Sequence, residues 1–270
     1  MSGNKLYYEE KGKGKTILFI HGFRVNTFTW RHVIPEFSQN YRCIAIDLKG
    51  FGKSPKPYDG KYSFFDHLEN VMKFIDEKGL KNFAIVGNSY GGGLAMAIAQ
   101  RFKEENREDE IKGLVLIDTM AYIQELPPFI KALTIPIISE IMSILIHPET
   151  ATKNALKEVW HDYSKVNQEI INAYKVKSLR DRYCAIQTAR QILRGNVEDF
   201  VNKIKEIEIP SLIIWGDKDR IIPLKTGHKL NKDLKNSELK IIENCGHVPQ
   251  EECPKKTSTL IKDFFGKINF

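Results

Sequence analysis

Short apolar runs recur along the chain, and glycine or polar residues bound each of them. Runs of this length are typical of buried strands, and apolar positions three or four residues apart are typical of helices. The pattern predicts strands at Leu6–Glu9, Ile17–Ile20, Cys43–Ile46, Phe83–Val86, Leu114–Ile117, Leu212–Trp215 and Leu239–Ile242, and helices at Trp30–Ser38, Phe65–Lys78, Gly91–Phe102, Thr226–Leu234 and Lys255–Phe265. This alternation indicates an α/β fold with a mostly parallel central sheet and helices on both faces.

The interval 121–195 breaks the alternation, because it carries helical periodicity, several prolines and no convincing strand. We therefore predict a helical cap at 121–195, inserted into a core formed by residues 1–120 and 196–270. Loops at the carboxyl ends of parallel strands build the ligand site of such sheets, so the cap is expected to cover that site.

Residues 126–146 of this cap carry apolar side chains at steps of three and four, with Pro136 near the middle. Such spacing forms one broad apolar face, which the proline splits. Part of the face is expected to pack on the core. Since it is wide for a short cap, we expect other side chains of the face to line an apolar pocket.

The lysines that give the chain its net charge of +7 are dispersed and mixed with acidic residues. This distribution is typical of a solvated surface, so no nucleic-acid partner is expected. The first residues lack the apolar segment of a signal peptide, and charges and a proline interrupt the longest apolar stretch, residues 129–146. We expect a cytoplasmic protein without stable membrane anchoring. The four cysteines lack the spacing of a zinc site, and no metal is expected.

Ser89 stands in the pattern G-x-S-x-G, formed by residues 87–91. A predicted strand precedes it and a predicted helix follows, which is the context of a nucleophile elbow. At such an elbow the serine adopts an unfavourable backbone conformation, and side chains at positions 87 and 91 would collide. The alternative is a contact between small residues of helix and sheet without chemical function. The matching context favours a nucleophile.

A serine hydroxyl needs a base to remove its proton. Of the seven histidines, His247 is the preferred base, because it lies on a short loop that follows the last predicted strand. His21 also follows a strand, and we assign it to the turn that shapes the site. His147 lies in the cap and could face the substrate. The other four lie in helix-like stretches and are expected to be surface or packing residues: His32, His67, His161 and His228.

The acid that orients this histidine should also follow a strand. Asp217 and Asp219 follow one predicted strand, and Asp118 follows another. Aspartate after glycine is common in turns, so Asp217 is interpreted as a turn residue. Asp219 gives the chain order Ser…Asp…His, while Asp118 is its rival because both strand ends could reach the same histidine.

One phosphate-binding signal is rejected. "GKGKT" at residues 12–16 resembles the end of a P-loop, but Glu9 occupies the position of the first glycine, and the segment precedes a strand instead of following one. We interpret it as a hairpin turn.

Taken together, the motifs resemble those of the α/β-hydrolase superfamily over nearly the whole chain. They are "HGF" (21–23), "DLKGFGKS" (47–54), "GNSYGG" (87–92), "WGDKDRIIP" (215–223) and "CGHVPQEECP" (245–254). The resemblance implies that Asp219 is the acid, and that the backbone amides of Phe23 and Tyr90 form the oxyanion hole. It also implies that Asp47 and Ser54 are mainly structural.

The resemblance further implies a carboxylesterase-like serine hydrolase without a cofactor. We expect it to cleave small-molecule esters with small to medium apolar acyl groups, through an acyl-enzyme. Dehalogenases and epoxide hydrolases of this fold have aspartate where this chain has Ser89. "GNSYGG" is also close to the "GNSMGG" of C–C bond hydrolases, which act on ring-fission products (vinylogous diketones), although these usually have an aromatic residue where this chain has Val248. Perhydrolases share the triad, and a ligand receptor on the same fold is the non-enzymatic alternative.

Overall fold

The computed structural model describes residues 5–122, 131, 134–135, 146–194 and 197–270. Within these ranges the chain forms a seven-stranded sheet in the order β1-β3-β2-β4-β5-β6-β7. The strands are β1 (Tyr8–Lys11), β2 (Thr16–Ile20), β3 (Arg42–Ile46), β4 (Phe83–Asn88), β5 (Ile111–Ile117), β6 (Ser211–Gly216) and β7 (Ser237–Ile242). Neighbouring strands are parallel, except that β1 runs antiparallel to β3 at the sheet edge. The predicted α/β fold with a mostly parallel sheet is confirmed.

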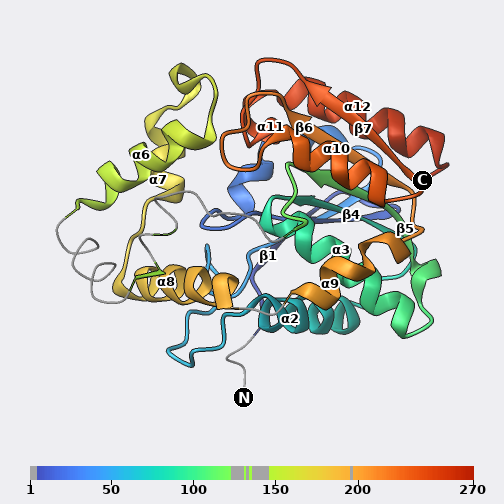
Figure 1. Ribbon diagram of the computed structural model, residues 1–270, viewed down its shortest axis with the longest axis horizontal. Coiled ribbons are helices and arrows are strands. Elements are labelled where there is room, and N and C mark those ends of the chain that lie inside the picture. Colours follow the sequence, from blue (N-terminus) through green and yellow to red (C-terminus); the bar gives the residue numbers. More distant parts are fainter. Residues whose placement is uncertain (1–4, 123–130, 132–133, 136–145, 195–196) are drawn as a thin grey trace.

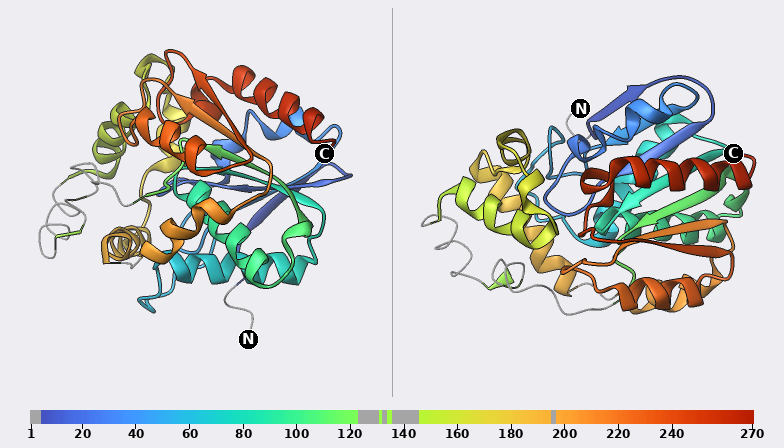
Figure 2. Two further views of the ribbon diagram at one scale, coloured as in Figure 1. Left: turned by 45° about the vertical axis from the view of Figure 1, so that its right-hand side comes forward. Right: turned by 90° about the horizontal axis from the view of Figure 1, so that it is seen from above.

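Helices cover both faces of this sheet (Figures 1 and 2). The helical segments around it are η1 (Thr27–Trp30), α1 (Ile34–Phe37), α2 (Phe64–Lys78), α3 (Tyr90–Glu104), η2 (Glu108–Glu110), α9 (Glu198–Asn202), η4 (Lys203–Glu206), α10 (Leu224–Asp233), α11 (Pro249–Glu252) and α12 (Pro254–Lys267). Strand side chains alternate between the faces. Ile20 and Ile85 pack in the core that includes α2, α3 and α10, whereas Phe19 and Val86 pack in the core that includes η1, α1 and α12.

The helix ends follow local sequence signals where these are strong. Helix α2 begins with a capping box between Ser63 and Asp66, and it ends at Gly79, whose φ of 58° is left-handed. The helix predicted at Trp30–Ser38 is instead divided into η1 and α1. Pro35 explains the division, because proline has no amide hydrogen and its ring disfavours a continuous helix before it.

The "GKGKT" segment is not a hairpin turn, and this prediction was wrong. Strand β1 pairs with β3, and β2 pairs with β3 and β4, so β1 and β2 are not neighbours. Between β1 and β2 the chain passes over the amino-terminal end of β3, so the two strands lie on opposite sides of β3. Gly12, with a φ of 85°, lies against the backbone of Ser38 and Tyr41, where a side chain would collide.

Among the described residues of the interval 121–195, the chain forms four helical segments: α6 (Pro148–Val159), η3 (Tyr163–Lys165), α7 (Gln168–Tyr174) and α8 (Leu179–Arg194). We call them the inserted helices. They lie together beside the sheet domain, at the left of Figure 1 and of both views in Figure 2. The apolar face predicted at 126–146 falls almost entirely outside the described residues, which there are only 131, 134, 135 and 146.

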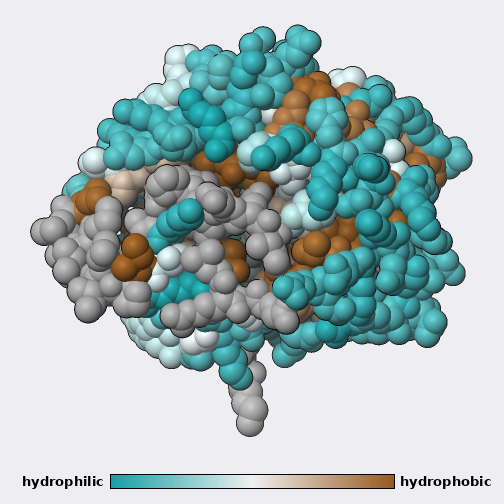
Figure 3. Space-filling view, viewed as in Figure 1, coloured by the Kyte–Doolittle hydropathy of each residue, from teal (hydrophilic) through white to brown (hydrophobic). Residues whose placement is uncertain are grey.

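The visible surface is mostly hydrophilic, and apolar side chains form separate patches on it (Figure 3). Among the described residues, no helix combines the length and the apolar character that a membrane span requires.

Candidate active site

Ser89 lies on a tight turn between β4 and α3. Its φ of 53° is in the left-handed region, which is unfavourable for a residue with a side chain. A β-carbon at Gly87 would lie 2.5 Å from the carbonyl oxygen of Gly91, and one at Gly91 would collide with the backbone of Ile20 and His21. The glycines therefore have the steric function predicted for a nucleophile elbow.

His247 and Asp219 meet in the loops that follow β7 and β6. The distance between Nδ1 of His247 and Oδ2 of Asp219 is 2.7 Å, and both side chains are buried. The other carboxylate oxygen of Asp219 accepts hydrogen bonds from the amides of Ile221 (2.7 Å) and Ile222 (3.0 Å). These amides fix the carboxylate while it holds the imidazole, and Nε2 of His247 is left to exchange a proton.

Asp118 lies near this pair but does not bind the imidazole. Its Oδ1 accepts a hydrogen bond from the amide of Gly216 (3.1 Å), and its φ of 42° is strained. Burial, followed by the negative charge of Asp219, raises the pKa of Asp118 well above its usual range. Asp219 is hydrogen-bonded to the imidazole, whereas the carboxyl group of Asp118 binds the amide of Gly216, so the geometry favours Asp219 as the acid.

Among the described residues, Asp118, Asp219 and His247 also form a cluster whose side-chain oxygen and nitrogen atoms are close enough together to bind a cation. Ligand atoms of Asp118, Asp219 and His247 lie within 4.8 Å of one another. Nδ1 of His247 is already hydrogen-bonded to Asp219, however. The group therefore fits an acid–base arrangement, and it would have to lose that hydrogen bond to bind a metal through Nδ1.

The two residues expected to form the oxyanion hole flank Ser89. Tyr90 is the first residue of α3, and amides of a first helical turn have no partner within the helix. Phe23 follows Gly22, where a β-carbon would lie 3.2 Å from the β-carbon of Ser89. The side chain of Tyr90 points elsewhere, since its hydroxyl lies 2.7 Å from Nδ1 of the buried His67.

Other motif residues are engaged in hydrogen bonds that shape the loops. His21 is buried, its Nδ1 donates to the carbonyl of Gly22 (2.7 Å), and its Nε2 accepts from the amide of Leu48 (2.9 Å). The carboxylate of Asp47 accepts from two backbone amides, and the hydroxyl of Ser54 donates to the carbonyl of Asp47. Both ring nitrogens of His21 are occupied, which leaves it no free nitrogen for proton transfer.

A pocket of about 100 Å³ opens beside Ser89 and His247. Most of its other walls are apolar and come from α6 and from the loops after β2, β6 and β7. The lining residues are Phe23, Arg24, Val25, Thr152, Ala155, Leu156, Val159, Trp160, Tyr174, Ile221, Val248 and Glu251. The inserted helices thus supply part of the pocket wall, as a cap would.

Glu252 was not singled out from the sequence. It connects the inserted helices to residues 243–248, the loop between β7 and α11 that carries His247, which we call the histidine loop. Its buried carboxylate accepts hydrogen bonds from the amides of Gly246 (2.8 Å), His161 (3.1 Å) and Asp162 (2.7 Å). Glu252 lies within "CGHVPQEECP", so the motif includes this residue, but the sequence pattern does not indicate its hydrogen bonds to distant backbone amides.

Arg220 makes a second connection of this kind. It donates hydrogen bonds to the carbonyl oxygens of Lys157 and Trp160 at the end of α6. The amide of His247 itself donates to the carbonyl of Val159 (2.8 Å). The end of α6 and the histidine loop therefore form one hydrogen-bonded unit.

The chain is similar to known proteins over nearly its whole length. YugF, an uncharacterized hydrolase of Bacillus subtilis (strain 168), is 30% identical over 267 residues, which cover 98% of this chain and 95% of that protein. Lipase 1 of Psychrobacter immobilis is 27% identical, with 97% of this chain and 81% of the lipase covered. A solved structure of a meta-cleavage product hydrolase from Pseudomonas fluorescens IP01 matches with a TM-score of 0.79 and 25% identity, covering 97% of this chain and 94% of that chain. The model of one family, described as alpha/beta hydrolase fold, matches residues 15–254, and the chain belongs to that family.

Proposed function

We propose that this protein is a carboxylesterase-like serine hydrolase. The observation that carries the proposal is the 2.7 Å contact between His247 and Asp219, at a pocket that Ser89 also lines. A strained serine, a buried imidazole and a carboxylate that orients it are the parts that acyl transfer requires.

In the proposed reaction, Nε2 of His247 takes the proton of Ser89 as its Oγ attacks the ester carbonyl. The amides of Phe23 and Tyr90 donate hydrogen bonds to the resulting oxyanion, a contribution of about 3 kcal/mol for each donor. His247 then gives its proton to the departing alcohol, which leaves an acyl-enzyme on Ser89. Water, activated by the same histidine, attacks this ester and releases the carboxylic acid.

We further propose that the acyl group is apolar and of small to medium size. The pocket beside Ser89 has apolar walls, which favour such groups. The lipase among the relatives supports ester hydrolysis as the reaction class.

The nucleophile assignment is tested by Ser89→Ala. We expect this variant to lose ester hydrolysis while its circular dichroism spectrum is unchanged, because a single hydroxyl is removed. A fluorophosphonate probe should label the wild type at Ser89 only, and Ser164→Ala, which removes an exposed serine in η3, should retain labelling and activity. Labelling at another residue, or activity of Ser89→Ala near the wild-type level, would contradict the assignment. Steady turnover of a 4-nitrophenyl ester, after any initial burst, distinguishes an enzyme from a receptor that is acylated once.

C–C bond hydrolysis is a second candidate, because the meta-cleavage product hydrolase shares the fold over nearly the whole chain. The same serine, histidine and aspartate would serve that reaction. The test is a vinylogous diketone assayed beside 4-nitrophenyl butanoate. A higher kcat/KM for the diketone would favour C–C cleavage, and turnover of the ester alone would favour the esterase.

A further inference from the structure

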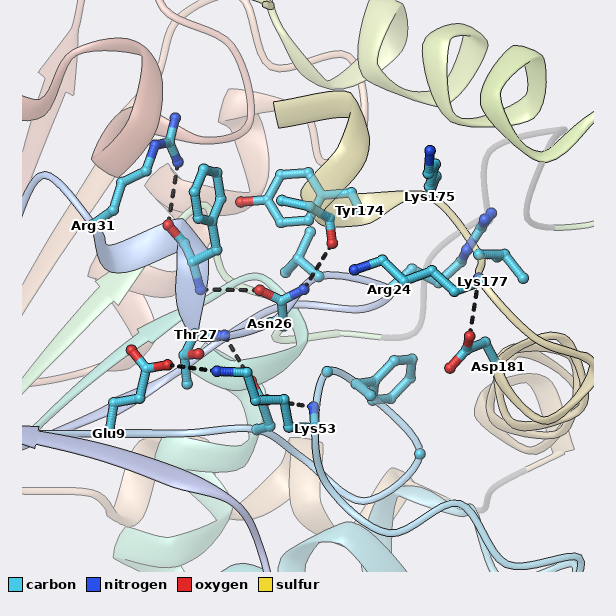
Figure 4. A pocket seen from close by; sticks show the side chains of 18 of the residues that line it. Glu9, Arg24, Asn26, Thr27, Arg31, Lys53, Tyr174, Lys175, Lys177 and Asp181 are labelled. Carbon is cyan, nitrogen blue, oxygen red and sulfur yellow. Dashed lines mark hydrogen bonds and ion pairs between the residues drawn. The ribbon is translucent and has the colours of Figure 1, made fainter. Parts of the chain in front are cut away.

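A second cavity, of about 410 Å³, lies next to the catalytic pocket. Arg24, Val25 and Tyr174 line both spaces. The second cavity is bounded by the loops after β2 and β3 and by the connection between α7 and α8, which carries Lys175 and Lys177 (Figure 4). A group bound there would thus be close to a substrate held at Ser89.

The acidic side chains of this cavity already have partners. Glu9 pairs with Lys53 (3.4 Å), and Asp181 pairs with Lys56 (3.5 Å). Asp47 accepts hydrogen bonds from two backbone amides, each at 2.7 Å. Two of the three carboxylates are therefore paired with a lysine, and the third, that of Asp47, is held by backbone amides.

Three cations of the cavity have no such partner. Arg31 pairs with Glu251, but within the described part of the chain the side chains of Arg24, Lys175 and Lys177 make no hydrogen bond or ion pair. In Figure 4 these three lie on the same side of the cavity. A surplus of positive charge consequently lies on that side of the cavity, where the charge of Lys175 also acts on Glu149 of α6.

Arg24 is unusual in two further respects. It is half-buried, and burial of an unpaired guanidinium is unfavourable. Its φ of 59° lies in the left-handed region, which is also unfavourable for arginine. Burial lowers the pKa of Arg24, but a guanidinium stays charged at neutral pH. Unfavourable backbone conformations cluster at ligand sites, where a bound group can compensate for them.

We propose that Arg24, assisted by Lys175 and Lys177, binds a carboxylate on the alcohol portion of the ester that Ser89 cleaves. The inference rests on the proposed ester hydrolysis and names its substrate class. A guanidinium can donate two parallel hydrogen bonds to a carboxylate, which suits Arg24 at the junction of the two spaces.

The alcohol portion is assigned to this cavity because the two spaces differ in character. The 100 Å³ pocket has mostly apolar walls, which suit the acyl group, whereas the 410 Å³ cavity is basic and reaches the exposed Lys53 and Lys177. An alcohol that carries a negative charge would also be released toward solvent along this path. The apolar acyl group remains part of the proposed substrate, and the negative charge is placed on its alcohol portion.

The test compares two chromogenic esters in the wild type and in Arg24→Met. One is 3-carboxy-4-nitrophenyl butanoate, with a carboxylate on the leaving group, and the other is the neutral 4-nitrophenyl butanoate. We expect Arg24→Met to lower kcat/KM for the anionic ester about 10- to 100-fold more than it lowers kcat/KM for the neutral one. Arg24→Lys should recover part of the loss, because it restores the charge without the guanidinium.

Lys53→Met is the matched control, because it removes a positive charge from the same cavity that is already paired with Glu9. It should lower kcat/KM for the anionic ester by less than about threefold. Equal losses for the two esters in Arg24→Met would overturn the proposal. Dependence on Arg24 for 4-nitrophenyl hydrogen adipate, in which the carboxylate is on the acyl side, but not for the leaving-group carboxylate would overturn it too.

A binding measurement separates this proposal from the proposed reaction. Calorimetry with Ser89→Ala and the anionic ester requires no turnover, and adding Arg24→Met should raise Kd about tenfold or more. If the wild type hydrolyses neither ester, ester hydrolysis fails as the function while the binding result still decides on the anion site. Turnover of the neutral ester without Arg24-dependent binding would overturn the anion site alone.

Discussion

At the scale of single residues, two buried aspartates lie near one imidazole, and they differ in their hydrogen bonds. Asp219 accepts two amide hydrogen bonds beside His247, which stabilise a carboxylate. Asp118 is enclosed without a cation, and its pKa is raised. Only the first is suited to hold the imidazole in the tautomer that a base requires.

We therefore expect Asp219→Asn to lower kcat on a butanoate ester by a factor on the order of 10³ to 10⁴, as for loss of the orienting acid in other triads. Asp118→Asn leaves the hydrogen bond between His247 and Asp219 in place, so its kcat should fall less than about tenfold. Steady-state kinetics of the two variants decides the point. The opposite order of effects would assign the orienting function to Asp118.

His67 should make stability depend on pH. Burial lowers its pKa from 6.5 to about 4, so between these values the unfolded chain binds the proton that the folded protein excludes. The free energy of unfolding should then fall as pH drops through this window, by up to roughly 3 kcal/mol.

His67→Gln cannot titrate and should lose correspondingly less stability over the same window, as measured by urea unfolding at several pH values. His228→Gln, which removes an exposed histidine on α10, should follow the wild-type profile. If the wild type and His67→Gln lose stability in parallel, another group causes the acid sensitivity.

At the scale of elements, the inner strands β2 to β6 could be predicted because they are buried and nearly continuous in apolar residues, whereas most residues of the edge strands β1 and β7 are partly or fully exposed. The order of the strands in the sheet could not be predicted, because it depends on which other strand the chain passes over between two consecutive strands. Gly12 shows this: a turn-like sequence carries the chain over β3 and not into a hairpin. The ends of α2 were accessible from Ser63 and Gly79, whereas Pro35 divided a helix whose apolar spacing had looked continuous.

Glu252 connects two elements, because it holds the loop that follows β7 against the residues that follow α6. Glu252→Gln places an amide group against backbone donors, and we expect it to lower the free energy of unfolding by about 1–3 kcal/mol. It should also lower kcat, since Gly246 adjoins the catalytic histidine. Glu243→Gln makes the same change at an exposed position of this loop and should affect neither quantity. Unchanged unfolding of Glu252→Gln in urea would contradict the structural importance of this carboxylate.

At the scale of the whole molecule, the acyl pocket is formed jointly by the sheet loops and the inserted helices. We expect 4-nitrophenyl butanoate to exceed the acetate in kcat/KM by about tenfold, because each buried methylene contributes about 0.8 kcal/mol. A series of esters from acetate to octanoate measures this. A steady fall in kcat/KM from acetate onward would mean that the pocket is too small or too polar for the proposed substrate.

The positions of the candidate reacting groups could be predicted from sequence because each follows a strand within a recognisable motif, as Ser89 and His247 do. Their surroundings could not. Arg24 makes no ion pair with a described residue because the nearby carboxylates of Glu9 and Asp181 are paired with lysines. The burial of Asp118 depends on packing between segments that are distant in the sequence. Periodicity and motif spacing contain neither kind of information.

The hydrogen bonds of Glu252 and Arg220 also bear on how relatives of this chain could exchange parts. A chimera that took its insertion from another hydrolase would need carbonyl and amide groups at the old positions of Trp160 and His161, or the recipient's histidine loop would lose its supports. The natural unit of transplantation is therefore the insertion together with the side chains at 220 and 252. Grafts designed on the boundaries of the insertion alone should yield folded proteins with impaired turnover.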